Sequence, residues 1–293
     1  MKKLMIAAVA SMAAVGAFAV VESPNIVGYA SPACNYGWKI YGAQFLSTSG
    51  AAANIQDLVV IGNDAEKVYW DADNNFRDKA PHLQIPNRTT PGGTAEKYYF
   101  IQDAWYPVEG NDEGATKPGW ADGDGSLVMD VTVTPGMAFW IKNQQPTSTE
   151  DFTVTTPGQV PDLTASYDNT TPGSGLWFLA SCAFPTAPQI NSGAVVVSGA
   201  PAIYWDADNN FRDTAAHLQV PNRTNPNGSA EKYYYIQDAW YPVEGNDEGA
   251  TKPGWADGDG SLVTDDAVTL PVGTGFWLKS STATTVTFHG SAN

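Results

Sequence analysis

Two acidic segments carry side-chain oxygens at spacings that suit a Ca²⁺ loop. Within residues 71–78 the oxygens alternate with other side chains, and within residues 122–126 glycines separate them. The first occurrence supplies Asp71, Asp73, Asn75, Asp78, Asp122, Asp124 and Ser126. The second occurrence supplies Asp206, Asp208, Asn210, Asp213, Asp257, Asp259 and Ser261. Ca²⁺ takes about six to eight oxygen ligands, so we predict Ca²⁺ as a cofactor at these loops.

Plain turns explain the same segments equally well, because Asp and Asn side chains accept hydrogen bonds from their own backbone. Neither segment is an EF-hand. The position of the bidentate Glu in an EF-hand is His82 after the first segment and Val133 after the second. The sequence therefore leaves the metal and the turn interpretations open.

Aromatic residues flank a polar loop, residues 109–113, in both of its occurrences. They are Trp105, Tyr106, Trp120, Trp240, Tyr241 and Trp255. An exposed ring beside carboxylates could stack on the C–H face of a sugar while the carboxylates accept hydrogen bonds from its hydroxyls. The competing interpretation, which the usual burial of tryptophan favours, is that these rings cover the core.

Motifs for catalysis are weak. The chain has no G-x-S-x-G or H-E-x-x-H segment, and His82 and His217 each stand alone in their context. A glycosidase needs two carboxyl groups at a defined separation, which the acidic residues of 103–113 could supply, as any acidic loop could. We expect no enzyme, and a glycan-degrading activity is the weakest alternative.

An internal repeat organises the chain. Residues 70–78 recur unchanged as 205–213, and residues 95–128 recur as 230–263 with one difference, Phe100 to Tyr235. Landmarks persist outside these blocks: Trp38 matches Trp177, and the segment 139–142 matches 276–279. We therefore predict two tandem homologous domains, at residues 24–156 and 157–293.

The local patterns are those of β-strands. Runs rich in β-branched and aromatic residues occur at 131–134, 152–155, 194–197 and 285–288, and Gly and Pro punctuate the chain at short intervals. Residues 97–106 are apolar or aromatic on both alternating faces, which predicts a covered central strand. The expected fold is mainly all-β, with two tandem β-sandwich-like domains.

The N-terminus predicts export. Lys2 and Lys3 precede an apolar run at residues 4–14, and residues 17–19 form an A-x-A cleavage signal, so residues 1–19 read as a bacterial secretory signal peptide. No later stretch approaches the ~20 apolar residues of a membrane span, so we expect no membrane insertion. The expected location is extracellular or in the cell envelope.

The charge of the chain limits its partners. There are 31 acidic against 15 basic residues, a net charge of −16. Nucleic acid is excluded as an expected partner, because its affinity depends on Lys and Arg that neutralise phosphates. Self-repulsion of this size destabilises a compact state, and bound divalent cations would offset it.

Two cysteines, Cys34 and Cys182, do not occupy equivalent positions in the two copies. An oxidising compartment permits a disulfide between them, which would tie the N-terminal segment to the second copy. Two buried free thiols are the alternative.

The start of the expected mature chain carries N-I-V-G-Y at residues 25–29, and residues 135–140 carry P-G-x-x-F-W. With these motifs the chain resembles a group of secreted bacterial proteins of uncharacterised activity. The second copy departs by one inserted residue, at 271–277. The resemblance implies a β-rich extracellular domain and brings no known site.

These observations favour an exported, non-catalytic surface, matrix or adhesive protein, stabilised by Ca²⁺. The alternative is a tandem carbohydrate-binding protein, in which two linked sites raise the overall affinity. The expected partners are a polysaccharide, another surface component, or a second copy of the chain.

Overall fold

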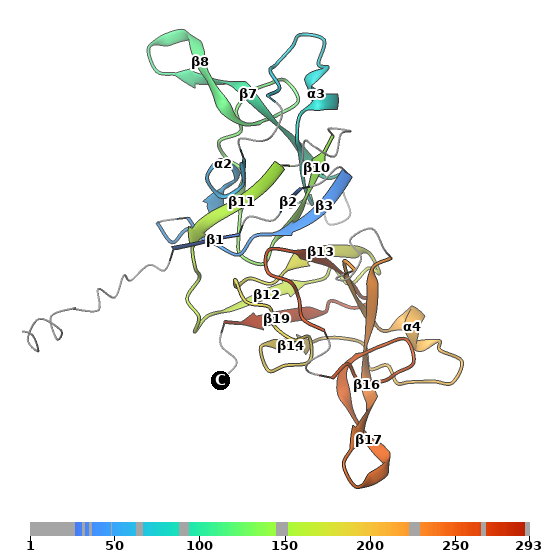
Figure 1. The fold of residues 1–293 in the computed structure, drawn as a ribbon. Coiled ribbons are helices and arrows are strands. Elements are labelled where there is room, and N and C mark those ends of the chain that lie inside the picture. The colour runs from blue at the N-terminus through green and yellow to red at the C-terminus, as the bar shows by residue number, and fades with distance from the viewer. Residues whose placement is uncertain are drawn as a thin grey trace, which may run out of the picture.

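The computed structural model describes residues 27–30, 33–34, 37–47, 49–62, 67–87, 94–144, 152–222, 229–264 and 268–290. In these ranges the chain forms antiparallel sheets and three four-residue helices, which confirms the all-β prediction (Figure 1). The signal peptide expected at residues 1–19 lies outside the described residues. No helix in the described ranges is long and apolar enough to cross a membrane.

Each copy of the repeat contributes a five-stranded antiparallel sheet, and the two sheets have equivalent strand orders. The first runs β3 (Gly37–Gly42), β10 (Ala138–Asn143), β6 (His82–Ile85), β7 (Glu96–Val108), β8 (Asn111–Ala121). The second runs β13 (Trp177–Ser181), β18 (Gly275–Lys279), β15 (Ala216–Val220), β16 (Glu231–Val243), β17 (Asn246–Ala256).

Smaller sheets lie beside the large ones. In the first copy β11 (Phe152–Gln159) pairs with β1 (Val27–Ala30), β2 (Ala33–Cys34) and β5 (Val60–Ile61), and β4 (Ala53–Asn54) pairs with β9 (Thr132–Val133). In the second copy β19 (Thr285–His289) pairs with β12 (Ser166–Thr170) and β14 (Val195–Ser198). The expected boundary at 156–157 falls inside β11, whose partners all belong to the first copy.

The β-branched runs of the sequence form strands where they were expected. They lie in β9, β11, β14 and β19, and residues 97–106 lie within β7, which has a strand on each side. The three short helices are α2 (Ile55–Leu58), α3 (Phe76–Lys79) and α4 (Phe211–Thr214).

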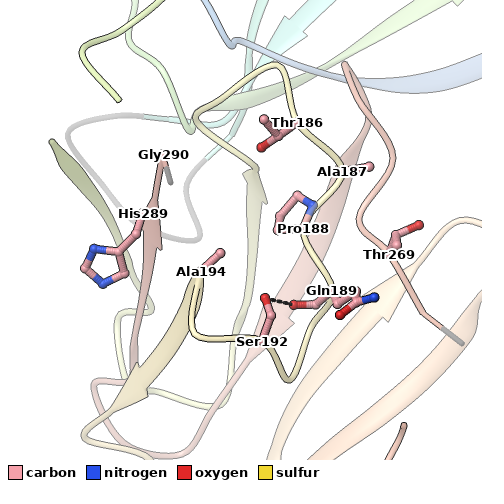
Figure 2. A pocket seen from close by; sticks show the side chains of 9 residues that line it. All are labelled: Thr186, Ala187, Pro188, Gln189, Ser192, Ala194, Thr269, His289 and Gly290. Carbon is pink, nitrogen blue, oxygen red and sulfur yellow. Dashed lines mark hydrogen bonds between the residues drawn. The ribbon is translucent and has the colours of Figure 1, made fainter. Parts of the chain in front are cut away.

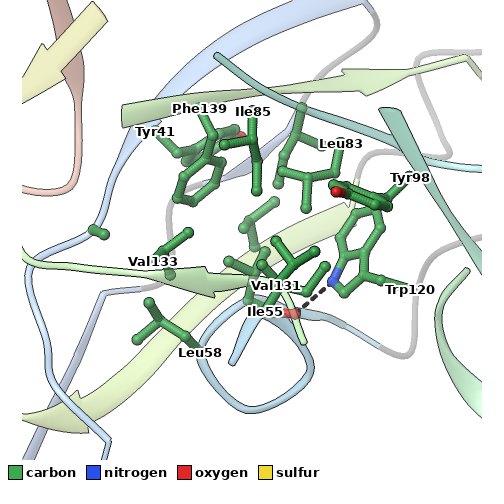
Figure 3. Packing of buried hydrophobic residues seen from close by; sticks show 14 of the residues in the cluster. Tyr41, Ile55, Leu58, Leu83, Ile85, Tyr98, Trp120, Val131, Val133 and Phe139 are labelled. Carbon is green, nitrogen blue, oxygen red and sulfur yellow. Dashed lines mark hydrogen bonds between the residues drawn. The ribbon is translucent and has the colours of Figure 1, made fainter. Parts of the chain in front are cut away.

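Alternation along the strands places one face of each large sheet in a core. On β10 the buried Phe139 and Ile141 share the first core with Phe152 and Val154 of β11. Figure 3 shows this packing around Trp120. A smaller cluster, which includes Phe76 of α3, covers part of the opposite face, and the second copy has an equivalent pair of cores.

Two long hairpins extend beyond the sheets. Of the residues of β7, only the first four, 96–99, pair with β6. The rest of β7 pairs with β8 alone. We call residues 104–117 and their equivalents 239–252 the arms. Figure 1 shows the arms at opposite ends of the molecule.

The two copies contact each other through equivalent backbone groups. The N–H of Gly42 donates to the carbonyl of Gly273 at 2.9 Å, and the N–H of Ser181 donates to the carbonyl of Gly136 at 2.8 Å. Gly42 and Ser181 end the matching strands β3 and β13, and the two carbonyls precede the matching strands β10 and β18. The contact therefore has pseudo-two-fold symmetry, with the same patch used from both sides.

Candidate functional site

Asp71 acts as a backbone cap. One carboxylate oxygen accepts from the N–H of Asn75 at 2.9 Å and the other from the N–H of Phe76 at 2.8 Å, which fixes the start of α3. These bonds, with the N–H of Asn75 as the largest cause, hold the pKa of the Asp71 carboxyl below its usual value. Asp206 repeats the arrangement at the start of α4.

The second acidic segment is also a turn. Oδ1 of Asp122 accepts from the N–H groups of Asp124 and Ser126, both at 2.9 Å. Arg77 joins the two segments, since its Nε donates to the carbonyl of Gly123 at 2.9 Å and its guanidinium lies 3.6 Å from Asp124. Arg212 makes the corresponding contacts with the second copy of the loop.

The contacts of both segments therefore match the turn interpretation. Asp73 and Asp78, which the Ca²⁺ interpretation also needs, lie exposed at the surface. Among the described residues no group of three or more His, Cys, Asp or Glu could hold a metal ion. Ca²⁺ binding stays a prediction.

Trp120 and Trp255 are core residues, which corrects their interpretation as ligand platforms. Their exposed fractions are 0% and 1%. The indole N–H of Trp120 donates to the carbonyl of Val59 at 2.8 Å, and its ring packs edge-on against Phe100 with 5.5 Å between centroids (Figure 3). A ring enclosed in this way presents no face to a sugar.

Trp105 and Tyr106 lie on the first arm. Trp105 is 42% exposed, its indole N–H donates to the carbonyl of Glu113 at 2.9 Å, and its ring covers Gly114, where a Cβ would collide with it. The Nζ of Lys117 lies 5.3 Å from the ring centroid of Tyr106. Trp240 and Tyr241 repeat these contacts, so all four rings brace the arms. Their ligand-binding role stays a prediction.

Cys182 is not bridged in this structure. Cys182 is a free thiol in the core of the second copy, and burial raises its pKa to about 11. Cys34 lies on β2, where it pairs with Phe152 of the first copy. Of the two alternatives that the sequence leaves open, this structure has the free thiol at Cys182, which is packed among apolar neighbours of its own copy.

A pocket of about 300 Å³ lies in the second copy (Figure 2). It is lined by Thr186, Ala187, Pro188, Gln189, Ser192, Ala194, Thr269, His289 and Gly290. The hydroxyl of Ser192 donates to the carbonyl of Gln189 at 2.7 Å, which closes the turn of residues 189–192 beside the pocket. The lining contains no carboxylate, so this pocket does not supply the pair of acids that a glycosidase uses.

Tryptophans from both copies gather on the outer face of the large sheets. On β10 the buried Phe139 and Ile141 alternate with the half-buried Trp140 and Lys142, and β18 repeats this alternation. The neighbouring strands β3 and β13 add one tryptophan each, in register with the lysines of β10 and β18. We call the resulting row the tryptophan strip; it consists of Trp38, Trp140, Trp277 and Trp177.

The tryptophan strip runs from one copy into the other. The equivalent residues Trp140 and Trp277 have ring centroids 5.2 Å apart, and Trp277 and Trp177 have centroids 6.2 Å apart. The outer residues, Trp38 and Trp177, are 43% and 40% exposed. The row thus crosses the pseudo-two-fold contact and is open to solvent at both ends.

Polar side chains border the strip. In the first copy the Nζ of Lys142 lies 5.7 Å from the ring centroid of Trp38, and Gln84 of β6 pairs with Trp140. The second copy repeats this border with Lys279, at 5.6 Å from Trp177, and with Gln219, which pairs with Trp277. The arrangement offers aromatic faces together with amide donors and acceptors and ammonium donors.

Sequence reasoning used these tryptophans only as landmarks of the repeat. A comparison of the two copies could have found them. When β3 is aligned with β13, the only identical residues are Trp38 and Trp177. On β10 and β18 the shared residues are the core Phe, the strip Trp and the bordering Lys.

Known proteins supply no relative for this site: no family model, curated protein or solved structure matches the chain.

Proposed function

We propose that this is an exported, non-catalytic binding protein that holds a polysaccharide at the tryptophan strip and serves as a surface, matrix or adhesive component. The observation that supports it most is that Trp140, Trp277 and Trp177 follow one another in ring contact across both copies, with Trp38 on the same face of the first sheet and the outer rings open to solvent. Aromatic faces stack on the apolar C–H faces of sugars. Gln84 and Gln219 can both donate to and accept from sugar hydroxyls.

The tandem arrangement suits a long ligand. A polysaccharide that contacts Trp38 and Trp140 is already close to the two tryptophans of the second copy. Binding of the second half is then intramolecular, and its effective concentration raises the overall affinity without a new kind of contact.

The test compares two pairs of tryptophans that are equally exposed. We expect the double variant Trp38→Ala/Trp177→Ala to lose at least about tenfold in affinity for a polysaccharide selected on a glycan array, since each stacked ring contributes roughly 1 kcal/mol. The matched control is Trp105→Ala/Trp240→Ala on the arms, where both residues are 42% exposed. Calorimetric titration measures both variants.

The strip variant should melt near the parent temperature, because neither ring lies in a core, and the arm variant should melt slightly lower, because it loses the hydrogen bonds to the carbonyls of Glu113 and Glu248. If the parent chain binds no polysaccharide, or if the arm variant loses as much affinity as the strip variant, the proposal fails.

A further inference from the structure

The tryptophan strip is free of negative charge in an acidic protein. The six strands that carry and border it, β3, β10, β6, β13, β18 and β15, contain no Asp or Glu. The chain as a whole has 31 acidic residues against 15 basic ones. Each arm, by contrast, includes Glu109, Asp112 and Glu113 or their equivalents. Charge is therefore segregated in the described part of the chain: the arms are acidic, whereas the strands around the strip carry lysine and glutamine but no Asp or Glu.

Lys142 and Lys279 are available to an external anion. The ion pairs of the described residues are Arg77–Asp124 and Arg212–Asp259, so neither lysine has a carboxylate partner there. The ammonium of Lys142 donates to the side-chain oxygen of Gln144, at 3.1 Å. Each ammonium lies beside the ring of an outer tryptophan, where a sugar would stack.

Lys97 extends this cationic border. In one row across the outer face, Trp140 pairs with Gln84 and Gln84 pairs with Lys97. The adjacent Glu96 points to the other face, where it accepts from the hydroxyl of Tyr98 at 2.8 Å. Lys232 occupies the same place in the second copy, next to Gln219.

The buried His82 lies next to the same lysines. Its ring is 5.3 Å from that of Trp38, and its exposed fraction is 8%. Burial, followed by the charges of Lys97 and Lys142, lowers the pKa of His82 to about 4. His82 is therefore neutral at pH 7, mainly because it is buried, and the two lysines on the outer face add to this effect.

We propose that the ligand of the tryptophan strip is a polysaccharide whose sugars carry carboxylates, a polyuronate. This inference rests on the proposed function and adds its chemistry: the rings stack on the sugars, and Lys142, Lys279, Lys97 and Lys232 pair with the carboxylates. The acidic arms repel the same polymer, so it is confined to the middle of the molecule.

The experiment uses one polymer in two charge states. Polygalacturonate and the neutral polymer made from it by carboxyl reduction are titrated into the full chain by calorimetry. We expect polygalacturonate to bind at least about tenfold more tightly, because two or more exposed ion pairs each contribute a modest attraction. Its affinity should also fall as salt is added.

Lysine variants locate the effect. Lys142→Gln/Lys279→Gln should lose about tenfold in affinity for polygalacturonate and little for the neutral polymer. The control is Lys117→Gln/Lys252→Gln, in which the lysines lie at similar distances, 5.3 and 5.1 Å, from Tyr106 and Tyr241 on the arms. This control should bind like the parent, and all variants should melt alike.

The outcomes separate the two proposals. Equal binding of the charged and neutral polymers, unchanged in the lysine variants, overturns the polyuronate inference and leaves the proposed function standing. Failure of the chain to bind either polymer or any other glycan overturns both. Equally tight binding of a single-stranded oligonucleotide shows a general polyanion surface and also overturns the polyuronate inference.

Discussion

Trp120 and Trp255 occupy equivalent core positions, yet their indole N–H groups have different surroundings. The N–H of Trp120 donates to the carbonyl of Val59, whereas the N–H of Trp255 has no partner in the described part of the chain. Val59 directly follows α2, a helix without an equivalent in the described second copy. One buried donor is satisfied and its equivalent is not, which costs free energy only in the second copy.

This difference predicts unequal losses of stability for the same substitution in the two copies. Trp120→Phe should lower the free energy of unfolding by about 1–3 kcal/mol, because it leaves the buried carbonyl of Val59 without its donor. Trp255→Phe removes an unpaired donor, so its cost should be smaller by at least about 1 kcal/mol. Urea unfolding of both variants measures the difference, and equal losses would contradict the assigned hydrogen bond.

At the scale of elements, a side-chain amide protects the edge of each large sheet. β8 and β17 are edge strands, and an edge offers unpaired N–H and C=O groups to other chains. Gln56 accepts from the N–H of Trp120 at 2.9 Å and donates to the carbonyls of Trp120 and Val128. Asn191 makes the same three bonds in the second copy, from a turn instead of α2. Lys117 and Pro118 discourage sheet addition further along β8.

Gln56→Ala should expose this part of the edge. We expect a loss of about 1–3 kcal/mol in unfolding free energy, since three hydrogen bonds disappear and the N–H of Trp120 and the carbonyl of Val128 lose the amide, while the carbonyl of Trp120 keeps the N–H of Val128. The control is Thr116→Ala, an exposed change on β8, whose unfolding free energy should lie within about 0.5 kcal/mol of that of the parent. Chemical unfolding gives both values; a Gln56 variant as stable as the control would show that the amide does not protect the edge.

The strands were predictable because their signals are local. Runs such as 152–155 and 285–288 carry β-branched residues whose preference does not depend on distant partners. The start of α3 was not predicted, because its cap depends on Asp71, whose spacing fits a turn and a metal loop alike. The sequence leaves the burial of Trp120 open, because this burial depends on a contact with Val59, which lies 61 residues away in the chain.

The site was harder to predict than the fold. Trp105 and Trp38 have nearly the same exposure, but only Trp38 belongs to a row that crosses both copies. That row exists because β10 and β18 meet at the pseudo-two-fold contact, and no local pattern specifies how two copies meet. The repeated block 95–128 is the more conspicuous pattern in the sequence, but its near-identity reflects recent duplication as readily as function.

For the whole molecule, the contact between the copies depends on close approach. A Cβ at Gly275 would collide with Ile40 and would come within 2.6 Å of the Cβ of Ala138. Ala138 is the equivalent of Gly275 in the first copy, at the start of β10. The two copies can therefore approach this closely because the second copy has Gly275 where the first copy has Ala138.

Gly275→Val should push the copies apart. We expect a lower melting temperature, a larger radius of gyration in X-ray scattering, and weaker polysaccharide binding, because the contact between Trp140 and Trp277 is disturbed. Gly193→Val is the control, since a Cβ there meets nothing within 4 Å. A Gly275 variant with the parent's dimensions and affinity would show that the strip does not depend on this contact.

The symmetry of the strip also concerns the direction of its ligand. A polysaccharide has a reducing end and a non-reducing end, but a half-turn of the protein exchanges Trp38 with Trp177 and Trp140 with Trp277. A chain running either way meets the same order of rings. If the proposed ligand binds there, two bound orientations would be available, and full equivalence between them would contribute RT ln 2, about 0.4 kcal/mol, to the binding free energy. Under the proposed function, a network in which glycan strands run in opposite senses would be held about as readily as one in which all strands run the same way.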